Sequence, residues 1–306
     1  MHAVLARLLV LAVALVTRLP WRWLRAAADA MAARAIRRDA REARVARRNL
    51  ELAYPDRLPA ERAELQRAIL ASTARQTLET LRLWTRPSRR NLETIDEVIG
   101  AERLDAAIAA GRGVIVAAPH HGNWELLNQW LASRTPLAIL YAPPESKVGD
   151  AFLNRVRATQ DQAGRVTQVR AEAAGVRQLF KWLKDGGVVG ILPDQQPKQG
   201  DGEFAPFFGR PALTMSLLGR LAARTGATVL VAWCERIADT PTGPRFALHV
   251  EAAPGGIADP DPATAAAALN AAVEHVARRD PAQYQWTYKR FSLQPDGQNP
   301  YWPDCY

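Results

Sequence analysis

Two histidines and one carboxylate lie within six residues of one another, directly after an apolar segment of the chain. His120, His121 and Glu125 follow the run Gly113–Ala118, which is predicted to be a buried β-strand. In α/β sheets, ligands bind beyond the carboxyl ends of strands. Imidazole titrates near neutral pH, and a neighbouring carboxylate can fix its tautomer and stabilise the imidazolium that forms. The spacing therefore predicts a general base, of the kind that a hydroxyl nucleophile needs.

The spacing alone leaves open which histidine is the base. On a continuous helix, His121 and Glu125 are four residues apart and share a face, whereas His120 and Glu125 do not. If the helix begins only near Asn123, His120 lies in the preceding loop and can fold back toward Glu125. Gly122 would permit that turn. Both arrangements are compatible with the sequence.

Other catalytic chemistries lack their usual sequence signals. No G-x-S-x-G motif surrounds any serine, and neither Cys234 nor Cys305 has a histidine nearby, so nothing indicates an acyl-enzyme. The motif H-E-x-x-H is absent and adjacent histidines rarely bind one ion together, so we expect no metal site and no cofactor. The two cysteines lie far apart without a CxxC pattern, which favours a reducing compartment.

The composition is that of a globular protein with a strongly basic balance. Of the 306 residues, 48% are hydrophobic and 23% are charged, which excludes a disordered chain. The mean hydropathy of −0.19 excludes a polytopic membrane protein. The net charge of +9 implies an acidic partner: nucleic acid, anionic lipid or an acidic protein. No RNP, zinc-finger or helix-turn-helix pattern accompanies the charge, so we expect no nucleic-acid partner.

Most of the positive charge lies near the amino terminus. Between Arg18 and Arg48 there are ten arginines and three carboxylates, so this segment contributes seven of the nine net charges. Ala3–Val16 is apolar apart from Arg7, and the tryptophans and arginines that follow are typical of a membrane interface. We therefore expect residues 1–25 to anchor the chain, either spanning the membrane or lying in one leaflet. The positive-inside rule then places the remainder on the cytoplasmic side.

Residues 26–306 are predicted to form one domain with a helical amino-terminal part over residues 26–90. The arginines from Arg34 to Arg48 fall largely on one face of a predicted helix, which either binds anionic lipid or is simply solvated. A second helix is predicted over Ala60–Trp84.

Beyond Pro87, apolar strands and amphipathic helices alternate, which predicts an α/β fold with a sheet flanked by helices. The predicted strands are Gly113–Ala118, Leu137–Tyr141, Val188–Leu192, Thr228–Trp233 and Phe246–Glu251. The predicted helices are Glu125–Ala132, Glu172–Leu183, Pro211–Arg224 and Ala263–Arg279.

The segment His120-His-Gly-Asn-Trp-Glu125 resembles the H-x4-D/E motif of membrane glycerolipid acyltransferases, in the form typical of the lipid A late acyltransferases. Further blocks resemble that family in the same order along most of the chain. They are Arg48–Asp56, Leu192–Gln195, Phe207–Pro211, Ala223–Ala227 and Pro281–Phe291. Several ordered blocks are far more specific than one motif. The resemblance implies a mixed sheet of the glycerolipid acyltransferase kind.

The resemblance also implies a reaction. His120 deprotonates an acceptor hydroxyl, which attacks the thioester carbonyl of the donor, while Glu125 holds the imidazole and no acyl-enzyme forms. The implied donor is acyl carrier protein, an acidic partner that a basic surface attracts, with acyl-CoA as the alternative. The implied acceptor is a lipid A precursor or a related glycolipid at the inner membrane.

Four residues are candidates for substrate binding. Arg170 resembles a family arginine that precedes a helix, and it either binds a substrate phosphate or is a surface arginine. Asp194 follows a predicted strand, where it orients Arg170 or a substrate hydroxyl, or caps a turn. Arg210 precedes a predicted helix whose free N–H groups suit an anion, with packing as an equal alternative. Asn123, inside the motif, is the fourth candidate.

Two departures from the family bear on the acceptor. The chain reads Tyr141-Ala142-Pro143 where the family often has Tyr-Arg-Pro, and Thr214-Met-Ser-Leu217 where it often has Thr-Thr-Thr-Gly. Another glycolipid, an aminolipid or a phospholipid is therefore an alternative acceptor. A membrane-anchored lipid-binding protein without catalysis is the alternative from another class, and it predicts that a His120→Ala variant keeps its function.

Overall fold

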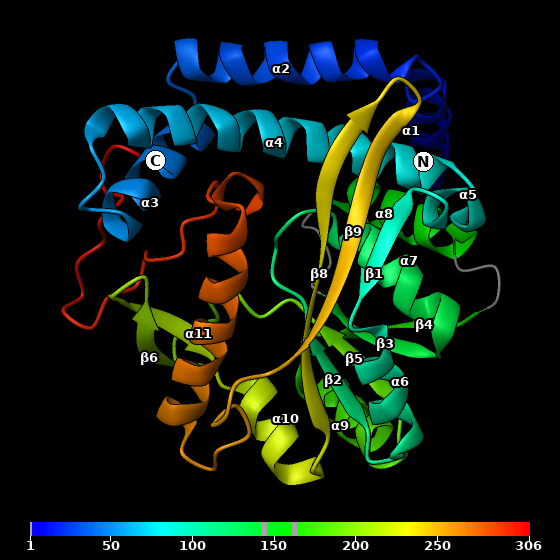
Figure 1. Cartoon of the computed structure of the whole chain (residues 1–306), viewed down its shortest axis with the longest axis vertical. Coiled ribbons are helices and arrows are strands. Elements are labelled where there is room, and N and C mark those ends of the chain that lie inside the picture. The colour runs from blue at the N-terminus through cyan, green and yellow to red at the C-terminus, as the bar shows by residue number, and fades with distance from the viewer. Residues whose placement is uncertain (1, 142–145, 161–163) are drawn as a thin grey trace.

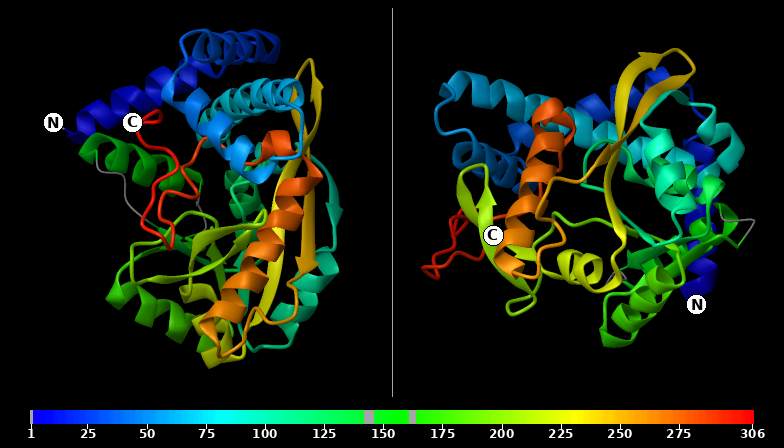
Figure 2. Two further views of the ribbon diagram at one scale, coloured as in Figure 1. Left: turned by 90° about the vertical axis from the view of Figure 1, so that its left-hand side faces the viewer. Right: turned by 60° about the horizontal axis from the view of Figure 1, so that its bottom comes forward.

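The computed structural model describes residues 2–141, 146–160 and 164–306, and Figures 1 and 2 show its arrangement. Within these residues, five helices precede the first strand. They are α1 His2–Val16, α2 Trp21–Arg37, α3 Arg41–Ala53, α4 Pro59–Thr85 and α5 Ser88–Leu92. Helix α4 runs along α2 on one side and faces the sheet on the other (Figure 1). The helical amino-terminal segment therefore packs directly onto the α/β part.

Seven strands of the described chain form one sheet in the order β1–β9–β8–β2–β5–β3–β4. Their bounds are β1 Ile95–Ile99, β2 Val114–Ala117, β3 Leu137–Tyr141, β4 Val166–Arg170, β5 Val188–Ile191, β8 Thr228–Thr240 and β9 Gly243–Ala252. Strands β4, β3, β5, β2 and β8 run parallel, β9 is antiparallel to β8, and β1 is parallel to β9. The predicted mixed sheet is confirmed.

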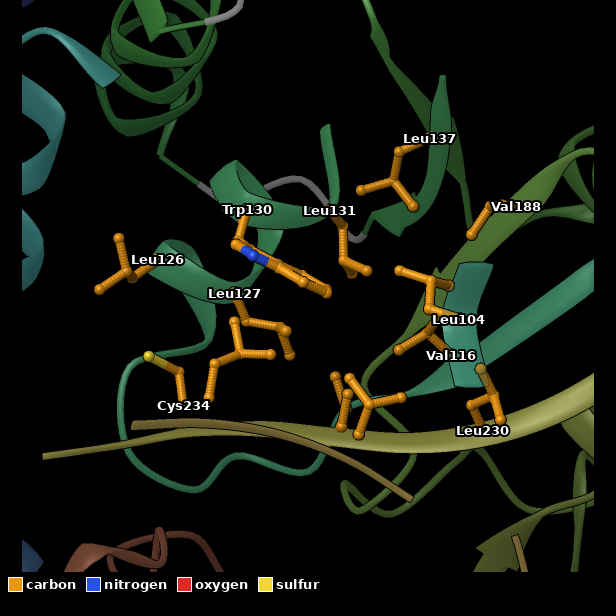
Figure 3. Packing of buried hydrophobic residues seen from close by; sticks show 14 of the residues in the cluster. Leu104, Val116, Leu126, Leu127, Trp130, Leu131, Leu137, Val188, Leu230 and Cys234 are labelled. Atoms are coloured by element: carbon orange, nitrogen blue, oxygen red, sulfur yellow. The ribbon is translucent and has the colours of Figure 1, made fainter. Parts of the chain in front are cut away.

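Strand β2 lies in the middle of the sheet and is buried on both faces. The flanking helices are α6 Ala101–Ala109, α7 Trp124–Arg134, α8 Lys147–Gln160, α9 Ala173–Lys184, α10 Leu217–Thr225 and α11 Pro262–Arg279. Because side chains alternate along a strand, Val114 and Val116 pack against α6 and α7, in the cluster that Figure 3 shows. Ile115 and Ala117 pack on the opposite face, against α9 and α10. Two covered faces explain why this strand is a continuous apolar run.

The segment predicted as the helix Pro211–Arg224 begins as a strand. Arg210–Met215 forms β7, which pairs antiparallel with β6 Gly202–Phe207, and α10 begins only at Leu217. Phe207 and Ala212 are buried beside α11, and this packing outweighs the helical spacing of the sequence. The two-stranded ribbon also tolerates Pro211. Proline has no backbone N–H to donate, and an edge strand has positions where no such donor is needed. The helix prediction is therefore wrong in its first part.

The basic helix predicted from Arg34 to Arg48 is interrupted. Helix α2 ends at Arg37 and α3 begins at Arg41, because Asp39 between them adopts a positive φ of 46°. The guanidinium of Arg44 folds back onto the Asp39 carbonyl. The chain therefore presents two short basic helices in place of one continuous face.

Helix α1 lies against α8 and α4 and leaves an apolar face exposed. Its inner face, with Ala6, Val10 and Val13, packs against Phe152 and Val156 of α8. Its outer face carries exposed side chains, among them Leu5, Leu8, Leu9, Leu11 and Leu15. Among the described helices, none alone is long and apolar enough to cross a membrane; α1 and α2 qualify only as a pair that is bent by 109°. The anchor expected over residues 1–25 stays a prediction.

Candidate active site

His120 and Asp194 each follow the carboxyl end of a strand, and the two strands, β2 and β5, are parallel neighbours in the sheet. In the pairing of β2 with β5, Ala117 lies opposite Ile191, and the Ala118 amide donates to the Ile191 carbonyl at 2.9 Å. His120 lies just beyond the end of β2, and Asp194 lies just beyond the end of β5. The sheet thus brings together two side chains that are 74 residues apart in the chain.

Asp194 holds His120 through both the backbone and the ring. The His120 amide donates to Oδ2 of Asp194 at 2.9 Å, and ring Nδ1 lies 2.7 Å from Oδ1. Because a carboxylate only accepts hydrogen bonds, Nδ1 carries the hydrogen and the lone pair of the neutral ring is on Nε2. Nε2 is therefore the atom that takes up a proton, and the side-chain amide of Gln195 lies 3.4 Å from it.

The surroundings keep Asp194 ionised. Burial raises its pKa, but the positive charge of the His120 ring when it is protonated, and the hydrogen bonds from His120, outweigh burial, so that the pKa of Asp194 lies below its usual value. Buried Tyr284 is close to this carboxylate: burial, and then the negative charge of Asp194, raise the pKa of the Tyr284 hydroxyl well above its usual value, so that it stays protonated. Trp124 makes a T-shaped contact with the imidazole, with ring centroids 4.8 Å apart. An ionised, fixed carboxylate behind a neutral imidazole can stabilise the imidazolium that forms when Nε2 accepts a proton.

Glu125 has a different partner. Its Oε1 accepts a hydrogen bond from Nη2 of Arg157 at 2.7 Å, and both side chains are largely buried. Arg157, on α8, also donates to Gln168 at 3.3 Å. The structure thus differs from the expectation that Glu125 holds the imidazole, because Asp194 occupies Nδ1 and Arg157 binds the Glu125 carboxylate. A catalytic role for Glu125 stays a prediction.

His121 is poorly placed to serve as the base. Its side chain is fully buried, and neither ring nitrogen has a hydrogen-bond partner among the described residues. Burial lowers the pKa of His121 from 6.5 to about 4, so the ring is neutral at physiological pH. Helix α7 begins at Trp124, which leaves His120 in the preceding loop. Of the two arrangements that the spacing left open, the geometry favours His120 as the base.

The loop that carries His120 is fixed from two sides. Gly122 has a φ of +56°, and a Cβ at this position would lie 2.0 Å from the Cys234 carbonyl oxygen, so no other residue fits. The Gly122 amide donates to the Gln283 carbonyl at 3.0 Å, and the Asn123 amide donates to the Cys234 carbonyl at 2.7 Å. Strand β8 and the segment after α11 therefore hold the loop between them.

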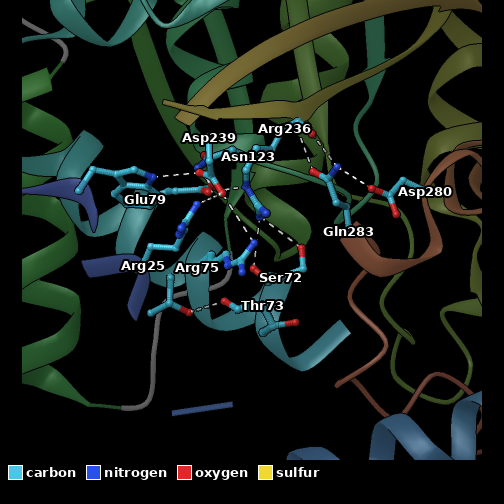
Figure 4. Close-up of polar contacts among 12 residues, drawn as sticks. Arg25, Ser72, Thr73, Arg75, Glu79, Asn123, Arg236, Asp239, Asp280 and Gln283 are labelled. Carbon is cyan, nitrogen blue, oxygen red and sulfur yellow. Dashed lines mark hydrogen bonds and ion pairs between the residues drawn. The ribbon is translucent and has the colours of Figure 1, made fainter. Parts of the chain in front are cut away.

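Asn123 caps α7. Its side-chain oxygen accepts from the Leu126 amide at 3.2 Å, and its side-chain nitrogen donates to Glu79 at 3.4 Å. Glu79, buried in α4, is ion-paired with Arg236 at 2.6 Å, and Figure 4 shows this network. Asn123 was predicted to bind substrate, but it is only 1% exposed and its polar atoms are used inside the protein. Its role in the structure is to position the motif.

The two arginines predicted to bind substrate do not join the pair of His120 and Asp194. Arg170 ends the edge strand β4, two strands from β5, and its side chain is exposed. Asp194 therefore orients His120 and not Arg170. Arg210 is also exposed; it lies in β7 and donates to a backbone carbonyl of α3 at 3.3 Å, so it does not precede a helix. Ala142, the departure from the family pattern, lies outside the described residues.

A cavity of about 620 Å³ opens between α4, α5, α7, α8 and β4. Glu125 and Arg157 are among the polar residues of its wall, together with Asn128, Gln129 and Gln168. Its apolar wall includes Trp84, Leu92, Ala132, Ile139 and Val166. This volume is within the range of small-molecule sites, about 300–1,000 Å³. His120 is not among the lining residues, so the cavity meets the motif at Glu125.

The sequence did not single out several residues that complete this arrangement. No motif marks Arg157, which binds Glu125. Tyr284 lies within the block Pro281–Phe291 but was not among the candidate site residues. Asp194 had a usable signal, since it follows an apolar strand just as His120 does. Among the described residues, no group of three or more His, Cys, Asp or Glu side chains is placed to hold a metal ion.

The chain is similar in sequence to known bacterial acyltransferases over most of its length. Residues 2–292 match the family described as bacterial lipid A biosynthesis acyltransferase. Over 260 residues the chain is 29% identical to the lipid A biosynthesis palmitoleoyltransferase of Escherichia coli K12, covering 83% of this chain and 80% of that protein. It is 27% identical over 261 residues to the lauroyltransferase of the same strain, covering 84% and 81%. It is 31% identical over 172 residues to the phosphatidylinositol mannoside acyltransferase of Mycobacterium tuberculosis, covering 55% and 53%.

Proposed function

Because the chain belongs to the bacterial lipid A biosynthesis acyltransferase family, we propose that it transfers a fatty acyl chain from a thioester to a hydroxyl of a lipid A precursor or a related glycolipid. The observation that supports this proposal most strongly is the contact of 2.7 Å between Nδ1 of His120 and Asp194. It leaves Nε2 as a base backed by a buried carboxylate.

In the proposed reaction, Nε2 of His120 takes the proton of the acceptor hydroxyl. The oxygen attacks the thioester carbonyl, the carbon–sulfur bond breaks, and the imidazolium returns its proton to the leaving thiolate. Asp194 lowers the free energy of the imidazolium because its pKa lies below the usual value and it is ionised throughout. The products are an ester and a free thiol, and the enzyme forms no covalent intermediate.

The cavity at Glu125 is the proposed place for the acyl chain. Its apolar residues suit a hydrocarbon chain, and its wall includes Glu125 of the motif. In that wall Glu125 forms an ion pair with Arg157 at 2.7 Å. We infer that Glu125 acts on the position of the donor chain through Arg157, and not on the imidazole.

The proposed donor is acyl carrier protein, with acyl-CoA as the alternative. Acyl carrier protein is acidic, and complementary charge speeds its encounter with a basic surface. The exposed arginines around the turn between α2 and α3 form such a surface: Arg34, Arg37, Arg38 and Arg41. Both donors present the same thioester to Nε2.

The proposed location is the inner membrane, with the α/β part on the cytoplasmic side. The support is the exposed apolar face of α1, followed by exposed Trp23 and the arginines of α2. Since α1 packs on α8 through its inner face, we propose that it lies in one leaflet. Anionic lipid is then the partner of the basic residues beside it.

The proposed acceptor is a lipid A precursor or a related glycolipid. Two of the similar proteins are named for lipid A and one for a phosphatidylinositol mannoside. To test the proposal, the purified protein in detergent is incubated with either an acyl carrier protein thioester or acyl-CoA, and with either a tetra-acyl lipid A precursor or a phosphatidylinositol mannoside. Mass spectrometry then detects the added acyl mass. Product from the wild type and none from His120→Ala supports the proposal; no transfer to either acceptor from either thioester contradicts it.

A further inference from the structure

Arg82, in the last turn of α4, is a buried cation without a matching anion. Its side chain is only 7% exposed, and it forms no ion pair with any described residue. Nη2 donates to the Thr242 carbonyl at 3.0 Å, while Nε and Nη1 have no hydrogen-bond partner among the described residues. The guanidinium carbon lies 5.6 Å from the centre of the Trp21 ring. A buried charge is normally paired and hydrogen-bonded, so a bound anion would supply the partner that the Arg82 guanidinium lacks.

A second cation is close to Arg82. Burial, together with repulsion by Arg86 one turn further on, lowers the pKa of Arg82 to about 10. At neutral pH both groups stay charged. Two guanidinium groups held near each other repel, and an anion between them would remove that repulsion.

The two arginines line a small cavity. Its volume is about 50 Å³, which holds roughly three to five water-sized groups, the size of a small oxyanion. The other lining residues are Glu79, Leu83, Asn91, Thr94, Thr242, Gly243, Pro244, Arg245 and Phe246. Glu79 is the one carboxylate among these described residues, and it is already paired with Arg236. The cavity is therefore positive inside.

We propose that this cavity binds a phosphate group, with Arg82 at its base and Arg86 at its mouth. A guanidinium donates to phosphate oxygens through its N–H groups, and Nε and Nη1 of Arg82, on two different edges of the group, each have a hydrogen without a partner among the described residues. Thr242 is exposed and Arg86 is half-exposed, so the cavity opens to solvent at the turn between β8 and β9.

The phosphate has two possible sources. The turn between β8 and β9 lies beside the start of α2 (Figure 1). There, Trp21 packs over Arg82, and the neighbouring Leu19 and Trp23 are exposed. A lipid headgroup would bring its phosphate to this corner if α1 and α2 lie in a membrane surface. A free phosphate ion satisfies the same donors. The recognition chemistry is shared, and the two sources differ in whether a membrane supplies the group.

The test uses the full-length chain and three variants, Arg82→Gln, Arg86→Gln and Arg67→Gln. Arg67 is the matched control because it is exposed on the same helix, it lies four turns away, and its loss changes the net charge equally. Thermal unfolding is followed while sodium phosphate replaces sodium chloride at constant ionic strength. At ten times the dissociation constant, we expect phosphate to raise Tm by about 2–4 °C in the wild type and in Arg67→Gln.

We expect Arg82→Gln and Arg86→Gln to lose this phosphate-dependent increase. A merely structural role of Arg82 would lower Tm in chloride but leave the increase unchanged. In a second arm, the variants are sedimented with phosphatidylcholine vesicles that contain phosphatidic acid. Weaker sedimentation of the Arg82 and Arg86 variants than of Arg67→Gln assigns the phosphate to a lipid headgroup; equal sedimentation with a lost Tm increase assigns it to the free ion. If neither measurement separates these variants from Arg67→Gln, the proposal is overturned.

Discussion

Replacing Asp194 by asparagine tests whether the carboxylate behind His120 supports proton transfer. The substitution keeps the size of the side chain, and the amide oxygen can still accept from the His120 backbone amide, which lies 2.9 Å from Oδ2. The amide nitrogen then takes the position of Oδ1, 2.7 Å from Nδ1. Because an amide nitrogen donates, the neutral ring has to carry its hydrogen on Nε2. That is the atom that must accept the proton of the substrate.

The expected loss has two parts. A hydrogen bond to a charged group contributes about 1.5–3 kcal/mol, which corresponds to roughly 10- to 100-fold in rate. The wrong tautomer adds to this, and in serine hydrolases the corresponding change costs about 10⁴-fold. We therefore expect Asp194→Asn to lower kcat by about 10²- to 10⁴-fold with little change in KM. Thermal unfolding should stay close to that of the wild type, because the backbone contact is kept.

The assay measures initial rates of acyl transfer by mass spectrometry at saturating acceptor. Glu125→Gln is the control, because it makes the same chemical change in a carboxylate that Arg157 binds. We expect the control to act mainly on KM for the donor. Suppose that a folded Asp194→Asn enzyme keeps more than about a tenth of the wild-type kcat and Glu125→Gln loses its activity. Glu125, and not Asp194, would then be the carboxylate that supports His120.

Three further predictions concern the loop and the membrane face. The pKa of His121 is 6.5 in the unfolded chain and about 4 in the folded protein. Above pH 6.5 the ring is neutral in both states and the folded protein has its full stability. As the pH falls below 6.5, only the unfolded chain takes up a proton, so the free energy of unfolding decreases. Between about pH 7 and 5 the loss is about 2 kcal/mol, and urea unfolding of His121→Phe should show a loss smaller by that amount. Gly122→Ala forces a Cβ to within 2.0 Å of a backbone oxygen at φ +56°; we expect at least about 2 kcal/mol of destabilisation in urea and near-complete loss of activity. Serine at the outer leucines of α1 should weaken liposome binding at least about 100-fold, whereas serine at Leu58, which is equally exposed in the turn directly before α4, should not. These leucines are Leu8, Leu11 and Leu15.

The central strands were predictable because they are buried on both faces. Such strands read as unbroken apolar runs, and β2 and β5 were located within a residue or two. The edge strands β1 and β4 were not predicted, since an edge strand is half-exposed and lacks that run. The ribbon of β6 and β7 was missed because Pro211 and the leucines after it also suit a helix start. Only its packing beside α11 decides between the two.

The base was predictable from its neighbours in the chain, but its partner was not. His120 follows a strand and lies within a recognisable motif, so local pattern was sufficient. Asp194 was marked as a strand-end residue, yet the sequence does not say that β2 and β5 are adjacent. Glu125 was expected to hold the imidazole because it belongs to the same motif, and the resemblance to the family implies that role. A contact across 74 residues depends on strand order, which periodicity does not report.

The most direct test of the central claim is the transfer rate of the wild type beside His120→Gln and His121→Phe. The claim is that Nε2 of His120, held through Nδ1 by Asp194, is the base for acyl transfer. We expect wild type and His121→Phe to add an acyl chain to the glycolipid, with His121→Phe within about tenfold, and His120→Gln to fall by at least about 10³-fold. Transfer by His120→Gln at the rate of the wild type would contradict the claim.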